Sequence, residues 1–413
     1  MYGRAGAVTG LSESGKRKMF AVGGAIARRA HALDHRFGAD GRGWVVWVCF
    51  ALLVLIARLD SGDTIENVFS VYRDAGLRWL HGQDLYPAQF RFNYFPPSAV
   101  FFAAWSWVPF GLEGALWRLA NIAVFAWGVW RISSCGAGPI APTRFFIATV
   151  VTVVLSASAA RYGQLTLAMA GLMMAALADV EEGGALWRAA IYVALAVALK
   201  PLAIVLALLL VAIYPRLWWR MAVALAAFFL LPFLFQHTDY VLRQYADVPG
   251  MLQIRSHQRY QWQHLFGLLE KLGWVATNAE QTIMTGAAAV FVLFLCWRAR
   301  QRAPAIGAAL TMYGLATSYI LLFGAATERN TYAMLAPVIG LGAAMAWHSR
   351  DRYLLALTSG IAWIMLLSHT LQRAYPHTML AMAKPFACLI LFAWLASMAI
   401  HGPTEASKRS PAP

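Results

Sequence analysis

Three carboxylates stand close together just after the first long apolar run of this chain: Asp60, Asp63 and Glu66. They open a polar stretch, residues 60–94, which places carboxylates at a membrane surface beside the next membrane element. A lipid-linked substrate with a water-exposed head group would be met at such a place. Acids can also merely solvate a loop or favour the start of a helix. As a group, these acids favour an enzyme of the membrane interface over a plain channel or scaffold.

Polar and ionisable residues also occur at the ends of later apolar runs. They are Arg161, Gln164, Lys200, Glu328, Arg329 and Asn330. Ionisable residues at membrane depth are functional candidates by default. Lys200 suits a phosphate contact as a point charge, although a lysine near a helix end can simply snorkel. Arg329 could bind a phosphate or diphosphate, and Glu328 or Asn330 could bind a sugar hydroxyl. The alternative is that Glu328 and Arg329 form a purely structural ion pair. Gln164 can bind a sugar or only cap a helix.

The segment around Trp262 combines amides, histidines and aromatic rings. Gln263 and His264 follow this tryptophan directly, and His257 precedes it. Aromatic residues beside amides are common in sugar-binding surfaces, and equally common in the aromatic belt of a membrane protein. No acid or cysteine completes a set at metal-ligand spacing, so we expect no metal site.

The overall composition predicts the class of protein. Of 413 residues, 60% are hydrophobic and 13% are charged, and the mean hydropathy is +0.57. A soluble domain is about half apolar and about a quarter charged. Because backbone polar groups in hydrocarbon must be satisfied within each segment, repeated long apolar runs predict helices. The fold class is therefore an all-α polytopic membrane protein.

The net charge of +15 does not indicate a nucleic-acid partner. The basic residues sit in short runs between apolar segments, which is typical of cytoplasmic loops. Anionic membrane lipids are the natural partners of such runs.

The same basic runs predict the organisation of the chain. Residues 1–42 form a basic cytoplasmic N-terminal tail, residues 43–400 a transmembrane domain, and residues 401–413 a second cytoplasmic tail. Counting residues 95–130 as one crossing, broken near residues 109–114, puts both termini on the cytoplasmic side with about 12 crossings. The first outer loop (60–94) and a long outer loop (236–281) then face outside, together with the site candidates. We expect a multi-pass protein of the cytoplasmic membrane.

The first outer loop also contains an amphipathic segment, Ser70 to His81. Val71, Ala75 and Trp79 share one face, and charged residues lie opposite. A helix of this kind lies in the plane of the interface. We expect it to form the floor of a site at the membrane surface.

Several short motifs resemble glycosyltransferase family 87, which belongs to the GT-C class of membrane enzymes. The first motif, G-x-D-L-Y…F-x-Y-x-P, is carried by Gly82, Asp84, Leu85, Tyr86, Phe92, Tyr94 and Pro96. Gly163-Gln164 and Leu199-Lys200-Pro201 match later motifs. The resemblance covers most of the chain from Leu59 to Tyr332.

The resemblance implies a GT-C-like helix bundle that transfers a sugar, most often mannose, from a polyprenyl-phosphate donor to a lipid or glycan acceptor with inversion. Tyr86 and Tyr94 then belong to the substrate-binding set. A carboxylate in the first outer loop takes the proton of the attacking hydroxyl, and Lys200, Arg161 or Arg329 stabilises the departing phosphate. No cofactor is then required.

The general base is assigned in an order of preference: Asp63, then Glu66, then Asp60. In the family the acid usually lies a few residues before the tyrosine that matches Tyr72, whereas residues 67–71 of this chain contain no acid. Two alternatives therefore stay open. One is a secondary transporter, since about a dozen helices and intramembrane charges also fit that class. The other is a non-catalytic subunit of an envelope glycan assembly.

Overall fold

The computed structural model is built from helices. It describes residues 40–61, 68–87, 91–109, 112–136, 138–257, 263–324, 327–375 and 378–402. The structure is 85% helical, and the described residues include no strand. The expectation of an all-α protein is confirmed.

The α-helices follow one another with short connections. Their bounds are α2 Gly41–Ser61, α3 Val68–Leu80, α4 Pro96–Ala103, α5 Glu113–Ser134, α6 Ala141–Arg161, α7 Thr166–Glu181, α8 Leu186–Leu199, α9 Ile204–Ile213, α10 Trp218–Leu230, α11 Thr238–His257, α12 Leu265–Lys271, α13 Asn278–Arg302, α14 Ala305–Phe323, α15 Ala336–Ser349, α16 Arg352–Ala374 and α17 Ala383–His401. Short 3₁₀ turns join several of them: η1 Ala104–Trp107, η2 Gly138–Ile140, η3 Pro201–Ala203, η4 Pro215–Leu217, η5 Leu231–Leu234, η7 Arg329–Leu335 and η8 Met379–Met382.

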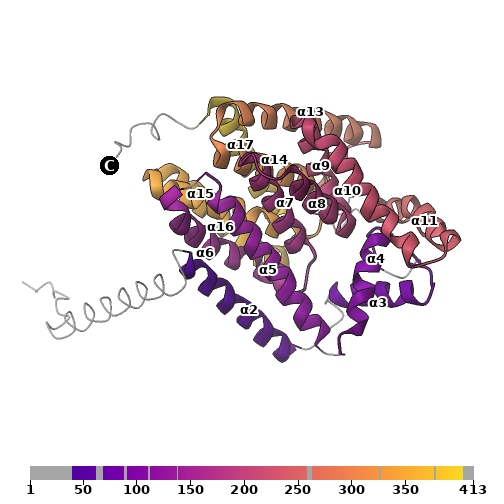
Figure 1. Ribbon diagram of the computed structural model, residues 1–413. Helices are drawn as coiled ribbons and strands as arrows, with labels where there is room; N and C mark the ends of the chain where they lie inside the picture. The colour runs from indigo at the N-terminus through magenta and orange to yellow at the C-terminus, as the bar shows by residue number, and fades with distance from the viewer. Residues whose placement is uncertain are drawn as a thin grey trace, which may run out of the picture.

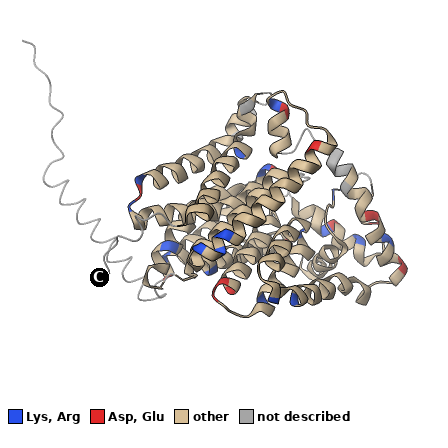
Figure 2. Ribbon diagram, turned by 90° about the horizontal axis from the view of Figure 1, so that it is seen from above, with Lys and Arg blue, Asp and Glu red and all other residues tan. Residues whose placement is uncertain are grey.

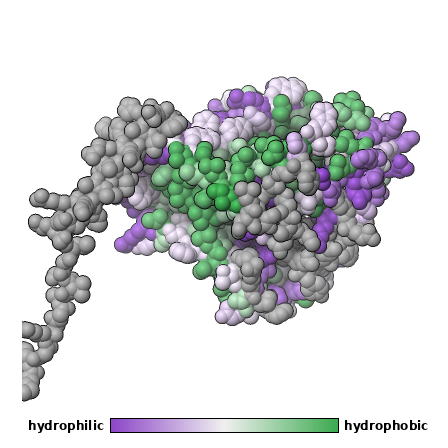
Figure 3. Space-filling view, turned by 90° about the horizontal axis from the view of Figure 1, so that it is seen from below, coloured by the Kyte–Doolittle hydropathy of each residue, from purple (hydrophilic) through white to green (hydrophobic). Residues whose placement is uncertain are grey.

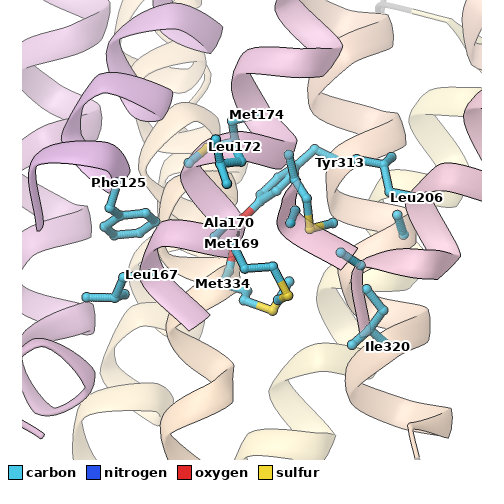
Figure 4. Close-up of a cluster of buried hydrophobic side chains, with 14 of the residues drawn as sticks. Phe125, Leu167, Met169, Ala170, Leu172, Met174, Leu206, Tyr313, Ile320 and Met334 are labelled. Carbon is cyan, nitrogen blue, oxygen red and sulfur yellow. Dashed lines mark hydrogen bonds between the residues drawn. The ribbon is translucent and has the colours of Figure 1, made fainter. Parts of the chain in front are cut away.

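Helix α7 is the centre of the bundle (Figure 1). Its sequence is apolar on every side, and a helix of that kind is stable only when other helices surround it. It packs against α5, α8 and α14. In Figure 4, Met169 and Met174 of α7 lie near Tyr313 of α14, and all three side chains are buried.

Glycines allow the closest helix approaches. A Cβ atom at Gly171 of α7 would fall within contact distance of the Val124 carbonyl of α5 and 2.9 Å from the Phe125 Cα. A Cβ at Gly340 of α15 would lie 2.6 Å from the Ala148 carbonyl of α6. Small residues at such crossings are typical of helix packing in membranes, where backbones approach without a gap.

The outer surface of the bundle is apolar. Five helical segments of the described residues are long and apolar enough to cross a membrane: Gly138–Arg161, Pro215–Leu234, Asn278–Arg302, Ala305–Phe323 and Leu380–His401. Exposed side chains such as Leu53, Val290 and Trp363 contribute to this surface, and Figure 3 shows a broad area of apolar residues. The chain is thus a membrane protein, and the number of about 12 crossings stays a prediction.

The segment 95–130 is broken, at the place where the sequence indicates a break. Helix α4 has 8 residues, η1 adds 4, and α5 begins anew at Glu113 with 22 residues. At 1.5 Å per residue, eight residues rise only about 12 Å, far less than the roughly 30 Å of a bilayer core. Of the two α-helices, only α5 is therefore long enough to cross the membrane.

Helix α3 packs on α4 and η1 at one end of the bundle (Figure 1). A Cβ at Gly76 would lie 2.6 Å from the Phe102 carbonyl, so the two helices touch through their backbones. Tyr72, Ala75 and Trp79 are buried, whereas Leu80 is exposed. The predicted amphipathic helix is present, with its buried face turned toward the protein.

Charged residues lie mainly near helix ends and in connecting segments, with long uncharged stretches of helix between them (Figure 2). At the end opposite α3, Arg131 bridges Asp179 at 2.6 Å and Glu182 at 3.0 Å. Arg300 donates to the Ile213 carbonyl at the same end. Arg131 and Arg300 therefore lie at the end of the bundle opposite the predicted site segments.

Candidate functional site

Five side chains from separate segments come together at the α3 end of the bundle. We call them the Glu328 cluster: Tyr72, Tyr94, Gln164, Lys200 and Glu328. Gln164 Nε2 donates to Glu328 Oε2 at 3.2 Å. The carboxylate of Glu328 also acts electrostatically on Tyr72, Tyr94 and Lys200. Four of the five residues, all except Tyr72, are among the sequence-predicted candidates.

Gln164 is placed by the turn between α6 and α7. Gly163 adopts φ +66°, a left-handed conformation that favours glycine, and its carbonyl accepts from Trp117 Nε1 at 2.8 Å. Asn121 Nδ2 donates to the Gln164 carbonyl, and Asn121 Oδ1 accepts from Ala168 N at 2.7 Å. With its backbone held in this way, the Gln164 side chain is only 2% exposed.

Two tyrosines form the wall beside this turn. The Tyr72 and Tyr94 hydroxyls lie 3.2 Å apart, and the Tyr72 oxygen accepts from Leu165 N at 3.3 Å. Tyr86 donates its hydroxyl to the Tyr94 carbonyl at 2.8 Å, which links the first-loop motif to the cluster. Burial raises the pKa of Tyr72 and of Tyr94 well above the ordinary value, so both hydroxyls keep their protons at neutral pH.

Lys200 occupies the junction between α8 and η3. The following proline prevents α8 from continuing, and Lys200 is extended (φ −143°, ψ 117°). The ammonium donates to Thr166 Oγ1 at 2.6 Å, and the side chain is 9% exposed. Burial lowers the pKa of Lys200, while the negative charge of Glu328 opposes that shift. Lys200 is therefore a buried cation with one nearby carboxylate.

The residues after Glu328 are held by α6 and α17. Asn330 Oδ1 accepts from Ser158 Oγ at 2.8 Å. The Arg329 carbonyl accepts from Lys384 Nζ at 2.9 Å, while the Arg329 side chain is exposed. Glu328 and Arg329 do not form the ion pair that the sequence offered as an alternative; Glu328 contacts Gln164 instead.

Arg161 is not drawn into the Glu328 cluster. Its carbonyl accepts from Arg118 Nε at 2.8 Å, and its side chain is exposed. Its guanidinium makes no hydrogen bond or ion pair to any residue that the structure describes. A role of Arg161 toward a substrate stays a prediction.

Gln263 and His264 anchor the segment that carries Glu328. Gln263 N donates to the Thr327 carbonyl at 2.8 Å, and its own carbonyl accepts from the Tyr332 hydroxyl at 2.8 Å. His264 Nδ1 accepts from Gly267 N at 3.0 Å and so caps α12. Both side chains are buried. These contacts are structural, and contact with a substrate stays a prediction.

Comparison with known proteins identifies the family. A family model for glycosyltransferase family 87 matches residues 92–323, more than half of the chain. The chain belongs to glycosyltransferase family 87. It is therefore a transferase enzyme, and the transporter and the non-catalytic subunit are set aside. No curated protein matches the chain.

The family 87 match contains part of the Glu328 cluster. Tyr94, Gln164 and Lys200 lie inside the matched range, whereas Tyr72 and Glu328 lie outside it. Tyr72, which the resemblance marks only as a matching tyrosine, was not among the candidate site residues, and neither were Thr166, Ser158 and Lys384. Thr166 and Ser158 lie within about two helical turns of Gln164, and that proximity is the signal that could have found them.

The three candidate general bases of this family 87 enzyme lie in or beside a segment outside the described residues. Asp63 and Glu66 fall outside the described residues. Asp60 belongs to the last turn of α2, and its side chain is not among those described. The assignment of the base stays a prediction, and Glu328 is the carboxylate that the structure places next to Gln164.

Metal ligands do not gather in the part of the chain that the structure describes. Within it, no group of three His, Cys, Asp or Glu side chains could hold an ion. Arg73 of α3 pairs with Glu113 of α5 at 2.7 Å, which ties the first-loop helix to the bundle.

Proposed function

We propose that this family 87 enzyme transfers a sugar, with mannose as our first choice, from a polyprenyl-phosphate donor to a lipid or glycan acceptor, inverting the anomeric carbon. The single observation that carries the proposal is the meeting of Gln164, Lys200 and Glu328 at one end of a membrane bundle. An amide and a carboxylate suit sugar hydroxyls, and a buried amine suits a phosphate.

The reaction needs a base and cations. The acceptor oxygen forms a bond to the anomeric carbon, while the bond from that carbon to the phosphate oxygen breaks. The phosphate leaves with the electron pair, and the acceptor proton passes to a carboxylate. Asp63, Glu66 and Asp60 are our candidates for that base, in this order. Lys200, Arg161 and Arg329 are candidates to stabilise the growing charge on the phosphate.

Sugar recognition is assigned to the remaining site candidates. Tyr86, Tyr94, Gln164, Gln263, His264, Glu328 and Asn330 are proposed to line the substrate position. The Gln164–Glu328 hydrogen bond supports this most directly, because it fixes a carboxylate oxygen beside an amide. Such pairs accept from and donate to vicinal hydroxyl groups.

The orientation in the membrane is also a proposal. We place the Glu328 cluster on the outer face of the cytoplasmic membrane and the tails, residues 1–42 and 401–413, in the cytoplasm. The separation of the cluster from Arg131 and Arg300 supports this, because basic residues collect on the cytoplasmic side.

A transfer assay tests the proposal. The purified full-length enzyme in detergent is given polyprenyl-phosphate-linked mannose, glucose or galactose, or GDP-mannose, with a membrane lipid extract as acceptor. We expect transfer from one polyprenyl-phosphate sugar and none from the nucleotide sugar. Transfer from GDP-mannose alone, or from no donor, would refute the donor class.

The same assay tests the base. Asp63→Asn is expected to lose most activity, since general-base catalysis contributes about 10²–10⁴-fold. Glu66→Gln is the second choice, and Asp74→Asn, an exposed acid on α3, is the matched control. If both Asp63→Asn and Glu66→Gln work at the control rate, neither residue is the base.

A further inference from the structure

A second group of charges lies beside the Glu328 cluster. Lys384 is in the first turn of α17, and its ammonium donates to the carbonyl of Arg329, the first residue of η7, at 2.9 Å. The positive charge of Arg329 also acts on Lys384. The Lys384 ammonium is thus fixed against the backbone of Arg329, 55 residues away in the sequence.

Nothing in the described residues compensates this pair of charges. Neither Lys384 nor Arg329 has an ion pair with any residue that the structure describes. Lys384 also stands in the first turn of a helix, where the helix dipole favours an anion and disfavours a cation. It lies half-buried within an apolar helical segment long enough to cross a membrane, where a charge marks a functional site.

Lys200, unlike Lys384, has a carboxylate near it among the described residues. It is buried, but the carboxylate of Glu328 acts on it and opposes the effect of burial. Lys200 therefore has a counter-charge within its own cluster. Lys384 and Arg329 carry two positive charges with no ion pair among the described residues, and suit an anion.

We propose that Lys384 and Arg329 hold the phosphate of the lipid donor; this inference rests on the proposed function. The planar guanidinium offers two parallel donors to phosphate oxygens, and the ammonium adds a point charge. When the bond from the anomeric carbon to the phosphate oxygen breaks, the phosphate gains negative charge. The pair then binds the departing lipid phosphate more tightly than the donor, which lowers the barrier.

Lipid-phosphate binding tests the inference without the need for turnover. Binding of a short polyprenyl phosphate to the full-length protein in detergent is measured by tryptophan fluorescence, beside the matching polyprenol and inorganic phosphate. The variants are Lys384→Met, Lys384→Arg and Arg329→Gln, with Lys271→Met of α12 as an exposed lysine control. Arg329→Gln keeps the backbone carbonyl that Lys384 contacts.

We expect Lys384→Met and Arg329→Gln each to weaken polyprenyl-phosphate binding at least about tenfold. Polyprenol binding should be unchanged, Lys384→Arg should retain most affinity, and Lys271→Met should match the wild type. Wild-type affinity in both neutral variants, or equal losses for phosphate and polyprenol, would overturn the proposal. Tight binding of inorganic phosphate that polyprenyl phosphate does not displace would also overturn the proposal.

The outcomes separate this inference from the proposed function. Lys384-dependent binding of polyprenyl phosphate without transfer from any donor would sink the function and leave the anion site standing. Sugar transfer at the wild-type rate by both Lys384→Met and Arg329→Gln would sink the anion site and leave the function standing.

Discussion

The hydrogen bond from Gln164 to Glu328 gives the sharpest prediction about the site. We expect Gln164 to act through Glu328, by fixing the carboxylate that meets a sugar hydroxyl. A hydrogen bond to a charged group contributes about 1.5–3 kcal/mol when it is shielded from water. Because Glu328 is exposed, water replaces part of the lost contact, and about 1 kcal/mol remains. That corresponds to about fivefold in rate.

The perturbation is a double-mutant cycle of Gln164→Met and Glu328→Ala. Methionine keeps the volume of glutamine but cannot donate. Gln164→Met is expected to lower kcat/KM about fivefold, and Glu328→Ala about tenfold or more. The double variant should be no slower than Glu328→Ala alone, which gives a coupling of about 1 kcal/mol.

The assay is sugar transfer by the purified enzyme, with unfolding temperatures measured for every variant. Gln281→Met is the matched control, since the Gln281 amide also donates a hydrogen bond, to the Ala276 carbonyl at 2.8 Å, but outside the cluster. Losses that simply multiply in the double variant would show that Gln164 does not work through Glu328. A Glu328→Ala enzyme as fast as the wild type would refute the role of the carboxylate.

Three further predictions concern the same elements. Burial lowers the pKa of Lys200, so kcat/KM should fall as the pH rises through that lowered pKa. Glu328→Ala removes the negative charge that opposes this shift and should move the fall to lower pH. An unchanged pH profile would contradict the assignment of the fall to Lys200. Gly171→Ala should destabilise the protein by about 1–3 kcal/mol by forcing α5 and α7 apart, whereas Gly286→Ala, where a Cβ meets nothing within 4 Å, should not lower the unfolding temperature. Tyr72→Phe should cost about 1–3 kcal/mol, because the buried Leu165 N–H loses its acceptor; equal melting of this variant and the exposed-site control Tyr375→Phe would argue against it.

The helices of this chain were largely predictable because their signals are local. The first apolar run predicts a span over residues 43–59, and α2 covers Gly41–Ser61. The segment 165–179 corresponds to α7, and the amphipathic stretch from Ser70 to His81 to α3. Gly82, with φ +63°, follows the end of α3, and Pro201 follows the end of α8, so local backbone preferences account for these two ends. The number of membrane crossings was not predictable in this way. Helices of 13 to 16 residues are shorter than a bilayer core is thick, so only their packing decides how deeply each one enters the membrane.

The grouping of Gln164, Lys200 and Glu328 was predictable at the level of segments. In a bundle, the ends of successive crossing helices alternate between the two sides, so residues 164, 200 and 328 could be assigned to the same side by counting runs. The structure places their side chains within one cluster. The partners were not predictable: that Gln164 meets Glu328, or that Lys384 reaches the Arg329 carbonyl, depends on how α17 and η7 pack. No local pattern encodes that contact.

The hydrogen-bonding capacity of the Glu328 cluster favours a ligand site over a core packed for stability alone. The Lys200 ammonium has three N–H donors, and among the described residues only Thr166 accepts from it. The Glu328 carboxylate has two oxygens, and Gln164 donates to one of them. A core designed for stability alone would pair the buried Lys200 ammonium fully or replace it with an apolar side chain, since unfilled polar groups at low dielectric are unfavourable. The donors and acceptors left over have the pattern of a hydroxyl-bearing ligand, which is the requirement that a sugar transferase places on such a cluster.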